Sequence, residues 1–598
     1  MKTNALQNRS FSRASGILAP LFSLPGVRDV GSLGSPARAF VDFLADAGQT
    51  YYQTLPVNPI DESGSPYAGR SAFAGETLYL DLEDFREQGL LNDRDLDSAW
   101  FLPSYLDPSG SSRPQTDSRS ERLNYADAFW RRSPLWEKAF DRYRRGLGGE
   151  KFRAEEERFR AESADWLDSY ALFVALAEKF GAYDWSQWPS EFKRRDSAAV
   201  AKFAAENERS LEKIRFLQLA FDVQWREFRA YCAERGVRIF GDVPIYVGKA
   251  SADVWSEPEL FLVDSEGRTI REAGVPADDY NPDGQKWNSP LYDWPKHKAT
   301  GFRWWKRRID ATLRRFDVVR LDHFIGFYNF YSFPGDGVDP VAGEIGAPPK
   351  ALVGNTERVY EEGWLPGPRE EFFEAIFEGR AKDAFVAEDL GVMNQGVVDL
   401  RDRFGLPGMK VLQFALGGGE QEVERAGDAE SSDGENSDPF ATWTENFVAY
   451  TGTHDGEPIM GWLDRELREN PEAFDEIERA LSRFAKEGDA PAPTPDLFEP
   501  ARQKSSDERG VSTAYRKLDP RAAKLHLAAL RSVADSKCKL AIFPIQDVVG
   551  LSGDSRINFP GVAAGAWSWR LADGLLDESL KNALLTLTLE ADRTAPRP

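Results

Sequence analysis

The sequence predicts an α/β fold: a (β/α)8 barrel of the TIM type with large, mostly helical insertions over the C-terminal face of the barrel. Three observations lead to this prediction. Short apolar runs alternate with helical patterns along 598 residues, which is typical of a parallel sheet covered by helices. The strand candidates number eight, as in a closed barrel. Several of them end in acidic residues, and barrel enzymes carry their active sites at the C-terminal ends of the strands.

The strand candidates are short and rich in apolar residues. They are GILA at 16–19, TYYQTLPVNP at 50–59, VRIFGDVPIYV at 237–247, VVRLD at 318–322, AFVAED at 384–389, MKVLQFAL at 409–416, NFVAYTG at 446–452 and LAIFPIQDV at 540–548. Helical patterns lie between most of them. These patterns cover 36–47, 211–235, 301–315, 369–379, 394–404 and 458–486. We therefore expect a single catalytic barrel over residues 1–598.

Three segments interrupt the alternation of strands and helices. Residues 90–210 are mostly polar helices and loops, which we interpret as a helical insertion subdomain. Residues 417–438 are acidic and rich in Gly and Ser, a composition typical of a mobile loop. Residues 487–510 are rich in Pro and form a further expected insertion. The last two segments fall between strand candidates, so we do not expect them to separate domains.

Composition limits the classes of partner. A net charge of −23 argues against nucleic acid, whose phosphates require a positive face, and against anionic membranes. The two cysteines, Cys232 and Cys538, are too few for a disulfide framework or a metal cluster. No apolar signal segment or membrane-spanning run is visible. We expect a cytoplasmic protein that acts on a neutral or cationic small molecule; the sequence leaves its oligomeric state open.

The stretch FDVVRLDHFIGF at 316–327 leads a strand directly into charged residues. Arg320 and Asp322 are two positions apart, so their side chains point to the same face of the strand. The guanidinium favours the ionised form of the carboxylate, and an ionised, oriented carboxylate can act as a nucleophile. A buried Arg–Asp pair that only closes the strand would give the same pattern.

Three further acids end other strand candidates: Asp242 in FGDVP, Glu388 in VAEDLG and Asp455 in YTGTHDG. Because the strands of a barrel end at one rim, we expect these side chains to converge. Cleavage of a glycosidic bond needs one carboxyl group to protonate the leaving oxygen and another to trap or stabilise the cationic sugar carbon. Binding of loop backbone or a neighbouring Arg is the alternative role for each of them.

Metal-assisted hydrolysis is a competing interpretation of acids beside histidines. The chain has four His, without H-x-H or H-E-x-x-H spacing, so the usual ligand patterns are absent. A Walker-type phosphate loop is also absent. We therefore predict neither a metal nor a cofactor.

Several motifs, in the same order along most of the chain, resemble those of the 4-α-glucanotransferases, the amylomaltase or disproportionating-enzyme family. They are SPY and SAFAG within 65–75, DSYALF at 168–173, WSQWP at 185–189, GDVPIYVGKASADVWSEPELF at 241–261, GVPADDYNPDGQKWNSPLYDW at 274–294, VRLDHFIGF at 319–327, AEDLG at 387–391, RFGLPGMKVLQFA at 403–415, YTGTHD at 450–455, and PIQDVVGL with RINFPG within 544–561.

The resemblance implies roles for individual residues. Asp322 matches the family's nucleophile, Glu388 its general acid/base, and Asp455 a third carboxylate that holds the sugar's 2- and 3-hydroxyls. The residues that match substrate contacts are Ser65, Tyr67, Asp278, Trp287, Arg320 and His454. Tyr67 would stack beneath the reacting glucose. Packing of loop aromatics is the alternative for Tyr67 and Trp287.

The resemblance also implies a reaction. A retaining transferase of this family would cut an α-1,4-glucan or maltooligosaccharide, hold the donor part on Asp322, and pass it to the 4-hydroxyl of an acceptor sugar. Burial and neighbouring carboxylates would raise the pKa of Glu388, which must be protonated at first. A glucan hydrolase on the same site, or a glucan-binding protein with little turnover, are the alternatives.

The chain departs from the family pattern at a few positions near these motifs. They are Ile325 in place of Arg, Gly456 in place of Asn, Glu62-Ser63-Gly64 in place of Tyr-Gly, Ala566 in place of Asn, and no His between His323 and His454. None of these changes touches the three carboxylates, but each can alter the sugar subsites, and with them the preferred substrate length and the ratio of transfer to hydrolysis.

Overall fold

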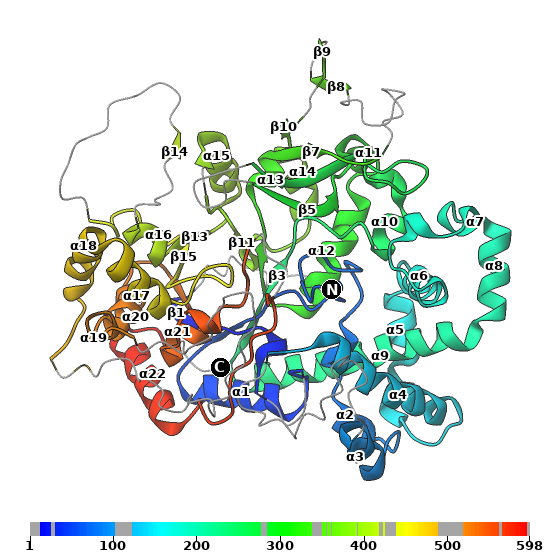
Figure 1. Cartoon of the computed structure of the whole chain (residues 1–598), viewed down its shortest axis with the longest axis horizontal. Coiled ribbons are helices and arrows are strands. Elements are labelled where there is room, and N and C mark those ends of the chain that lie inside the picture. The colour runs from blue at the N-terminus through cyan, green and yellow to red at the C-terminus, as the bar shows by residue number, and fades with distance from the viewer. Residues whose placement is uncertain are drawn as a thin grey trace, which may run out of the picture.

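Eight parallel strands form the centre of the molecule (Figure 1). The computed structural model describes residues 12–25, 30–101, 122–276, 284–337, 350–353, 356–359, 362–391, 393–417, 423–424, 438–487, 489, 518–560 and 565–594. The central strands are β1 (Ala14–Leu18), β2 (Tyr51–Gln53), β3 (Arg238–Val243), β6 (Val318–Leu321), β11 (Phe385–Ala387), β13 (Gly408–Val411), β15 (Phe447–Tyr450) and β16 (Leu540–Pro544). Each lies within or next to one of the predicted strands.

The strand order shows a barrel that is nearly closed. It runs β11-β6-β3-β2-β1-β16-β15-β13, so sheet neighbours are successive central strands along the chain, and the last strand pairs with the first. The two end strands, β11 and β13, are also successive, and the Ala387 amide donates to the Pro407 carbonyl at 2.8 Å across the seam between them. The prediction of a (β/α)8 barrel is confirmed.

Two of the predicted strands continue as short helices. The segment 409–416 is strand only to Val411 and continues as the helix α16 (Leu412–Leu416). The segment 540–548 likewise ends its strand at Pro544 and continues as α21 (Ile545–Val549). Apolar runs alone do not distinguish a strand from a short buried helix that follows it.

Helices surround the sheet. Those near the predicted helical segments are α1 (Ser35–Asp46), α9 (Glu208–Glu234), α12 (Arg303–Arg315), α14 (Arg369–Phe377), α15 (Gln395–Phe404), α17 (Ile459–Glu469) and α18 (Pro471–Ser482). The segment 458–486 was expected as one helical pattern and forms two helices. The break falls at Asn470-Pro471 because proline has no N–H to continue the helical hydrogen bonds, whereas it is well tolerated in a first turn.

Several other elements are short or peripheral. They are α2 (Leu82–Glu87), α10 (Ala252–Ser256), α11 (Trp294–Ala299), α13 (Ile325–Tyr328), α19 (Pro520–Ala523), α20 (His526–Ala534), α22 (Glu578–Glu590), β8 (Lys350–Val353), β9 (Thr356–Val359), β12 (Met393–Asn394) and β14 (Val423–Glu424). None of the described helices is long and apolar enough to cross a membrane.

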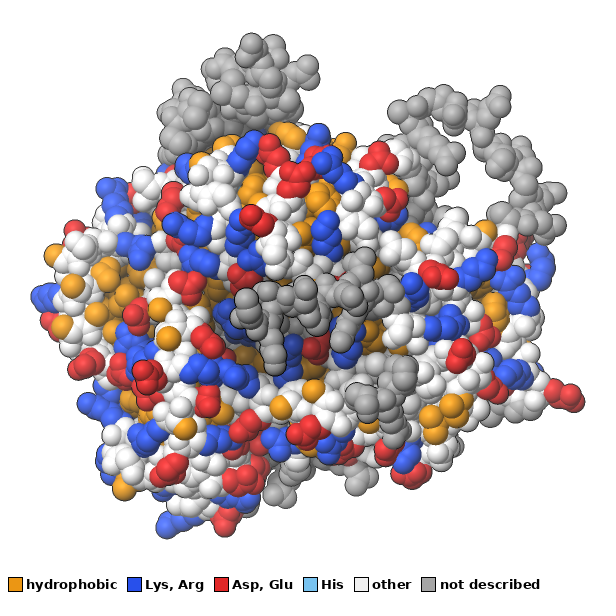
Figure 2. Space-filling view, turned by 180° about the vertical axis from the view of Figure 1, so that it is seen from behind, with side chains coloured by type: hydrophobic (Ala, Val, Ile, Leu, Met, Phe, Trp, Pro, Cys, Tyr) orange, Lys and Arg blue, Asp and Glu red, His pale blue; other side chains and the backbone are white. Residues whose placement is uncertain are grey.

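Figure 2 shows basic side chains interspersed with acidic ones over one face of the molecule.

The region 90–210 contains a group of helices at one side of the barrel (Figure 1). They are α3 (Asp93–Phe101), α4 (Tyr125–Arg144), α5 (Glu150–Glu162), α6 (Leu167–Phe180), α7 (Ser190–Lys193) and α8 (Ser197–Glu206). Phe216 of α9 lies among aromatic rings of α2, α4 and α5. Whether these helices form a subdomain of their own stays a prediction, as do the roles of 417–438 and 487–510, most of which lie outside the described residues.

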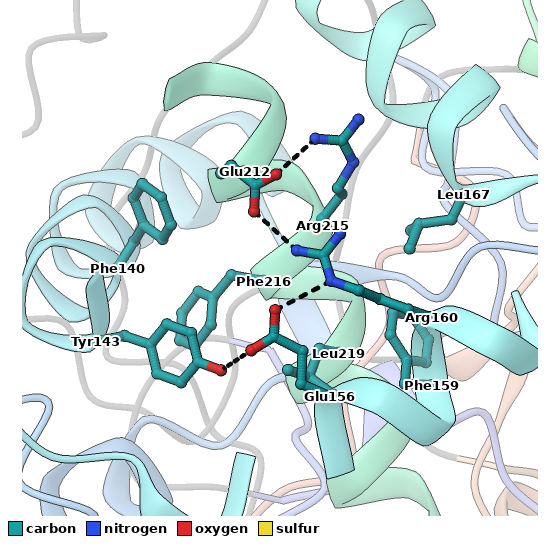
Figure 3. Close-up of a pocket in the computed structure, with 10 residues that line it drawn as sticks. All are labelled: Phe140, Tyr143, Glu156, Phe159, Arg160, Leu167, Glu212, Arg215, Phe216 and Leu219. Atoms are coloured by element: carbon teal, nitrogen blue, oxygen red, sulfur yellow. Dashed lines mark hydrogen bonds and ion pairs between the residues drawn. The ribbon is translucent and has the colours of Figure 1, made fainter. Parts of the chain in front are cut away.

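A small cavity lies between α4, α5, α6 and α9 (Figure 3). Its charged groups pair with one another: Arg160 contacts Glu156 at 3.0 Å and Glu212 at 2.8 Å. Tyr143 donates to Glu156 at 2.7 Å. A volume of about 20 Å³ holds about one water molecule. These groups therefore tie the helices together and leave no room for a sugar.

A second sheet was not predicted. It is antiparallel, in the order β10-β7-β4-β5, and consists of β4 (Arg271–Val275), β5 (Gln285–Pro290), β7 (Asn329–Pro334) and β10 (Gly363–Pro366). Strands such as REAGV and QKWNSP lack the apolar alternation that identifies a strand from sequence. This sheet carries Trp287 on its edge strand β5.

The interior of the barrel is filled by alternate residues of the strands. A separate buried cluster consists of Ala14, Leu18, Tyr51, Phe240, Val318, Val386, Met409, Val411, Val448, Tyr450, Leu540 and Ile542. These positions are two apart along β13, β15 and β16 and four apart along β1, as expected for side chains on one face of a strand. The same alternation continues toward the C-terminal ends of β3, β6 and β11. The side chains that follow the apolar ones on these strands therefore also point toward the barrel axis.

Asp389 closes the seam between β11 and β13. Its carboxylate accepts from the Met409 amide at 2.7 Å and pairs with Arg401 of α15. Gly408 leaves the space for it, because a Cβ at that position would lie 2.3 Å from Asp389 Oδ2. A side chain at 408 would therefore push the carboxylate off the seam.

We expect Gly408→Ala to lower the free energy of unfolding by about 1–3 kcal/mol, the usual cost of overpacking a buried site. Met409→Leu, a volume-conserving change at the next residue, should cost less. Denaturant unfolding of both variants measures the difference. Parental stability in Gly408→Ala would show that the seam does not depend on this contact.

Candidate active site

The C-terminal ends of β3, β6 and β11 bring charged side chains together at the barrel axis. The strand register pairs Arg320 with Asp242 on one side and with Val386 on the other. Asp322 follows β6, and Glu388 follows β11. Phe240, Val318 and Val386 point into the barrel, and every second residue after them does so too. The charged residues therefore converge because they occupy inward-pointing positions of their strands.

Arg320 is the centre of this cluster. Its Nη1 donates to Asp242 Oδ2 at 2.7 Å and to Asp322 Oδ1 at 2.8 Å, and its Nη2 lies 3.8 Å from Glu388 Oε2. The Arg320 side chain is only 6% exposed. Burial by itself would lower the pKa of Arg320, but Asp242 and Asp322 outweigh that effect and raise it. The guanidinium is therefore a fixed positive charge.

The carboxyl groups around Arg320 differ in their access to solvent. The exposed fraction of the side chain is 1% for Asp242, 12% for Glu388 and 22% for Asp322. Asp322 is thus the one that a molecule in solution reaches most easily. Its backbone amide donates to the Val243 carbonyl at 3.1 Å, which holds the end of β6 against β3.

Glu388 is held by backbone amides on both of its carboxyl oxygens. The His323 amide donates to Oε2 at 2.7 Å and the Leu390 amide to Oε1 at 3.1 Å. Burial raises the pKa of Glu388 to about 8; Arg320 works against this rise and the charge on Asp322 adds to it. Burial likewise raises the pKa of Asp242 to about 7. Near neutral pH the cluster therefore holds protons that ordinary carboxyl groups would have lost.

His323 turns the chain away from the strand immediately after Asp322. Its φ of +49° lies in the left-handed region, which non-glycine residues seldom adopt. Its ring meets Trp287 of β5 edge to face, with centroids 5.0 Å apart. Burial lowers the pKa of His323 to about 4, so the ring is neutral at physiological pH. The antiparallel sheet thus reaches the strand end that carries Asp322.

Tyr67 links an aromatic stack to the charged cluster. Its hydroxyl donates to Asp242 Oδ2 at 2.8 Å, and its ring is parallel to that of His454, with centroids 5.1 Å apart. The Trp567 ring lies 5.6 Å from Tyr67. Ser65 accepts from the Tyr67 amide at 3.2 Å through its hydroxyl, and its own amide donates to Asp61 Oδ1 at 3.0 Å, so Ser65 helps to order this loop.

Asp455 lies on the loop after β15, next to His454, whose Nε2 is 3.3 Å from Asp455 Oδ2. The side chain of Asp455 is 45% exposed, more than those of the other acids. Asn558 donates to Asp455 Oδ1 at 2.6 Å, and Arg556 donates to its backbone carbonyl at 2.6 Å. Asp455 contacts His454, the His454 ring stacks on Tyr67, and Tyr67 bonds to Asp242 of the charged cluster.

Sequence reasoning gave no role to three of these partners, although it expected Asp242 to converge with the other acids. Asp242 was noted as a fourth acid at a strand end but was not assigned to the site, although its spacing from Asp322 carried the same signal. Asn558 and Arg556 lie in the RINFPG motif, which was noticed without a role for any of its residues. Asp278, an expected substrate contact, lies outside the described residues.

Gly456, one of the departures from the family pattern, borders Gln413. A Cβ at Gly456 would lie 3.0 Å from Gln413 Oε1, and Gln413 donates to the Glu457 carbonyl at 2.6 Å. The glycine therefore leaves Gln413 in place beside the loop of Asp455. Over the part of the chain that the structure describes, no cluster of three or more His, Cys, Asp or Glu is arranged to hold a metal ion.

An eight-stranded parallel barrel with carboxyl groups gathered at its strand ends is an enzyme architecture. The family model described as 4-alpha-glucanotransferase matches residues 19–576. The chain belongs to the 4-alpha-glucanotransferase family of enzymes, as its motifs predicted.

Relatives of known name cover nearly the whole chain. It is 34% identical over 581 residues to the 4-alpha-glucanotransferase of Synechocystis, with 96% of this chain and 97% of that protein covered. It is 34% identical over 570 residues to that of Thermus thermophilus, with 94% and 96% covered. The solved structure of amylomaltase from Streptococcus agalactiae in complex with acarbose matches with a TM-score of 0.77 and 28% identity, over 97% of this chain and 99% of that one.

The raised pKa of Glu388 predicts how stability depends on pH. The folded state retains the Glu388 proton up to about pH 8, whereas the unfolded chain loses it near 4.3. Folding stability is therefore lost as pH rises between these two values. Glu388→Gln removes this loss, so we expect its stability relative to the parent to increase by about 3–4 kcal/mol between pH 5 and pH 8.

Denaturant unfolding at pH 5 and pH 8 measures this difference. Glu378→Gln, at a side chain that is 78% exposed, serves as the control and should follow the parent at both pH values. A constant difference between Glu388→Gln and the parent would contradict the buried, protonated state of Glu388.

Proposed function

We propose that the protein is a retaining 4-α-glucanotransferase that acts on α-1,4-glucans and maltooligosaccharides, with Asp322 as nucleophile and Glu388 as general acid/base. The observation that carries the proposal is the shared contact with Arg320. It places an accessible carboxylate and a buried, protonated carboxyl group around one guanidinium. Acarbose bound to the similar amylomaltase of Streptococcus agalactiae supports a sugar ligand for this fold.

In the first half-reaction, Asp322 attacks the anomeric carbon of the donor sugar. Arg320, 2.8 Å away, stabilises the negative charge of the attacking carboxylate by a charge-assisted hydrogen bond. The glycosidic C–O bond breaks, and Glu388 gives its proton to the leaving oxygen. The products are a glycosyl ester on Asp322 and a shortened glucan with a free 4-hydroxyl.

In the second half-reaction, the ionised Glu388 takes the proton of an acceptor 4-hydroxyl, whose oxygen attacks the anomeric carbon of the glycosyl ester. The ester bond breaks, a new α-1,4 bond forms, and Asp322 is released as a carboxylate. The raised pKa of Glu388 suits both steps, because a group that gives and regains a proton works best with a pKa near the working pH.

The other predicted residues have supporting roles in this proposal. Asp455 holds the 2- and 3-hydroxyls of the donor sugar, and Tyr67 with His454 supplies a surface beneath it. Trp287 and Asp278 contact the sugar chain on the donor or the acceptor side of the cleaved bond, and Ser65 orders the loop of Tyr67. Transfer exceeds hydrolysis when the acceptor is bound in position and water is not.

Incubation with maltotriose tests the proposed reaction. A transferase produces a ladder of shorter and longer maltooligosaccharides, a hydrolase releases glucose and maltose without longer products, and a binding protein forms no product. We expect the ladder. Asp322→Asn should lose both transfer and hydrolysis by at least about 10⁴-fold, because the covalent step needs this carboxylate.

Asp310→Asn is the matched control, since Asp310 lies on the outer helix α12 and pairs with Arg380. It should keep the full ladder. Substantial activity in pure Asp322→Asn protein would refute the assignment of the nucleophile.

The pH dependence of kcat/KM on the alkaline side tests the role of Glu388 as general acid/base. Glu388 must be protonated in the free enzyme, so we expect kcat/KM to fall about tenfold per pH unit above pH 8, where its raised pKa lies. Activity that still rises through pH 9 would contradict this role. Steady-state rates with maltotriose between pH 5 and pH 10 provide the measurement.

A further inference from the structure

The loop that carries Asp455 is clamped at both ends by one buried carboxylate. The loop runs from the end of β15 to the start of α17, and Thr451 and Ile459 are its two ends. Asp547 Oδ2 accepts from the Thr451 hydroxyl at 2.5 Å, and Asp547 Oδ1 accepts from the Ile459 amide at 2.7 Å. A single side chain thereby fixes the separation of the two ends.

Asp547 belongs to the segment that follows the neighbouring strand β16, in the PIQDVVGL motif, to which the proposed reaction assigns no role. Its exposed fraction is 0%. No Lys or Arg within the described ranges forms an ion pair with it; His526, from α20, contacts only its backbone carbonyl, at 2.6 Å. A buried carboxylate without a cation is costly, and the two hydrogen bonds from the loop are what compensate it.

The same stretch of chain also holds the middle of the loop. Beyond α21, Asn558 donates to Asp455 Oδ1, and the Asn558 amide donates to the His454 carbonyl at 3.2 Å. The loop is thus attached to the β16 side of the barrel at its two ends and at its functional residue. Displacing either end would move Asp455 relative to Asp322 and Glu388.

We propose that Asp547 is a positioning residue for Asp455: by clamping Thr451 and Ile459 it sets the conformation in which Asp455 meets the sugar. The inference rests on the proposed function, since it requires Asp455 to act on the substrate. Burial raises the pKa of Asp547 to about 6, against the two hydrogen bonds, which lower it. Protonation of Asp547 does not break its contact with Thr451, because the Thr451 hydroxyl can rotate and accept a hydrogen bond from the protonated carboxyl group.

Two substitutions at 547 separate the hydrogen-bond pattern from the charge. Asparagine can accept from the Ile459 amide with its oxygen and donate to the Thr451 hydroxyl with its nitrogen. We therefore expect Asp547→Asn to keep kcat for maltotriose within threefold of the parent. Leucine has a similar volume and neither bond, so Asp547→Leu should lower kcat by 10- to 100-fold with KM changed by less than threefold.

A double-mutant cycle shows whether Asp547 acts through Asp455. If it does, Asp547→Leu should cost much less in the Asp455→Asn background than in the parent. Should Asp547→Leu fail to fold, Thr451→Val, which removes one end of the clamp, takes its place in the same cycle. Asp464→Leu is the matched control: it removes a buried carboxylate of α17 that accepts from the Asp519 amide at 3.0 Å. It should lower thermal stability without changing kcat.

Additive effects of Asp547→Leu and Asp455→Asn, or an unchanged kcat in folded Asp547→Leu, would overturn the proposal. So would loss of activity in Asp547→Asn equal to that in Asp547→Leu. Failure of the proposed function is distinct from all of these results, because the parent itself would then form no ladder from maltotriose.

Discussion

The site depends on one buried guanidinium shared among carboxyl groups. Arg320 bonds to Asp242 and Asp322 and lies near Glu388, in a place where an unpaired carboxylate would be very costly. Because one cation cannot neutralise three carboxylates, burial leaves Glu388 and Asp242 with raised pKa values. Burial therefore leaves carboxyl groups that hold protons near neutral pH beside the more exposed Asp322, and such differences between neighbouring carboxyl groups are what acid/base catalysis with a nucleophile requires.

The location of this cluster follows from the geometry of the barrel. Inward side chains alternate along each strand, and apolar ones fill the interior until the C-terminal ends are reached. At those ends the inward-pointing side chains are polar, so the apolar core forms the floor of the site. The left-handed conformation of His323 then takes the chain off β6 directly after Asp322, which keeps that carboxylate at the rim and not inside.

Much of the fold and part of the candidate site could be predicted from the sequence. The eight strands were found because central parallel strands are uninterrupted apolar runs, and strand parity put Arg320 beside Asp322. The antiparallel sheet was missed because strands such as β4 and β5 lack the apolar pattern that identifies a strand from sequence. The contact between Tyr67 and Asp242, and that between Asn558 and Asp455, join residues more than 100 positions apart. No local pattern encodes such pairs; they arise from which loops the closed barrel places together.

The antiparallel sheet separates two tasks that many enzymes combine. Trp287 enters the site from β5, an edge strand of a sheet that shares no strand with the barrel, whereas the groups proposed to react stand on the barrel itself. Under the proposed function, β5 is part of the wall that a sugar chain meets, and substitutions along it would leave the guanidinium cluster in place. Altering this sheet would then change the length of the products while the reacting centre stays as it is.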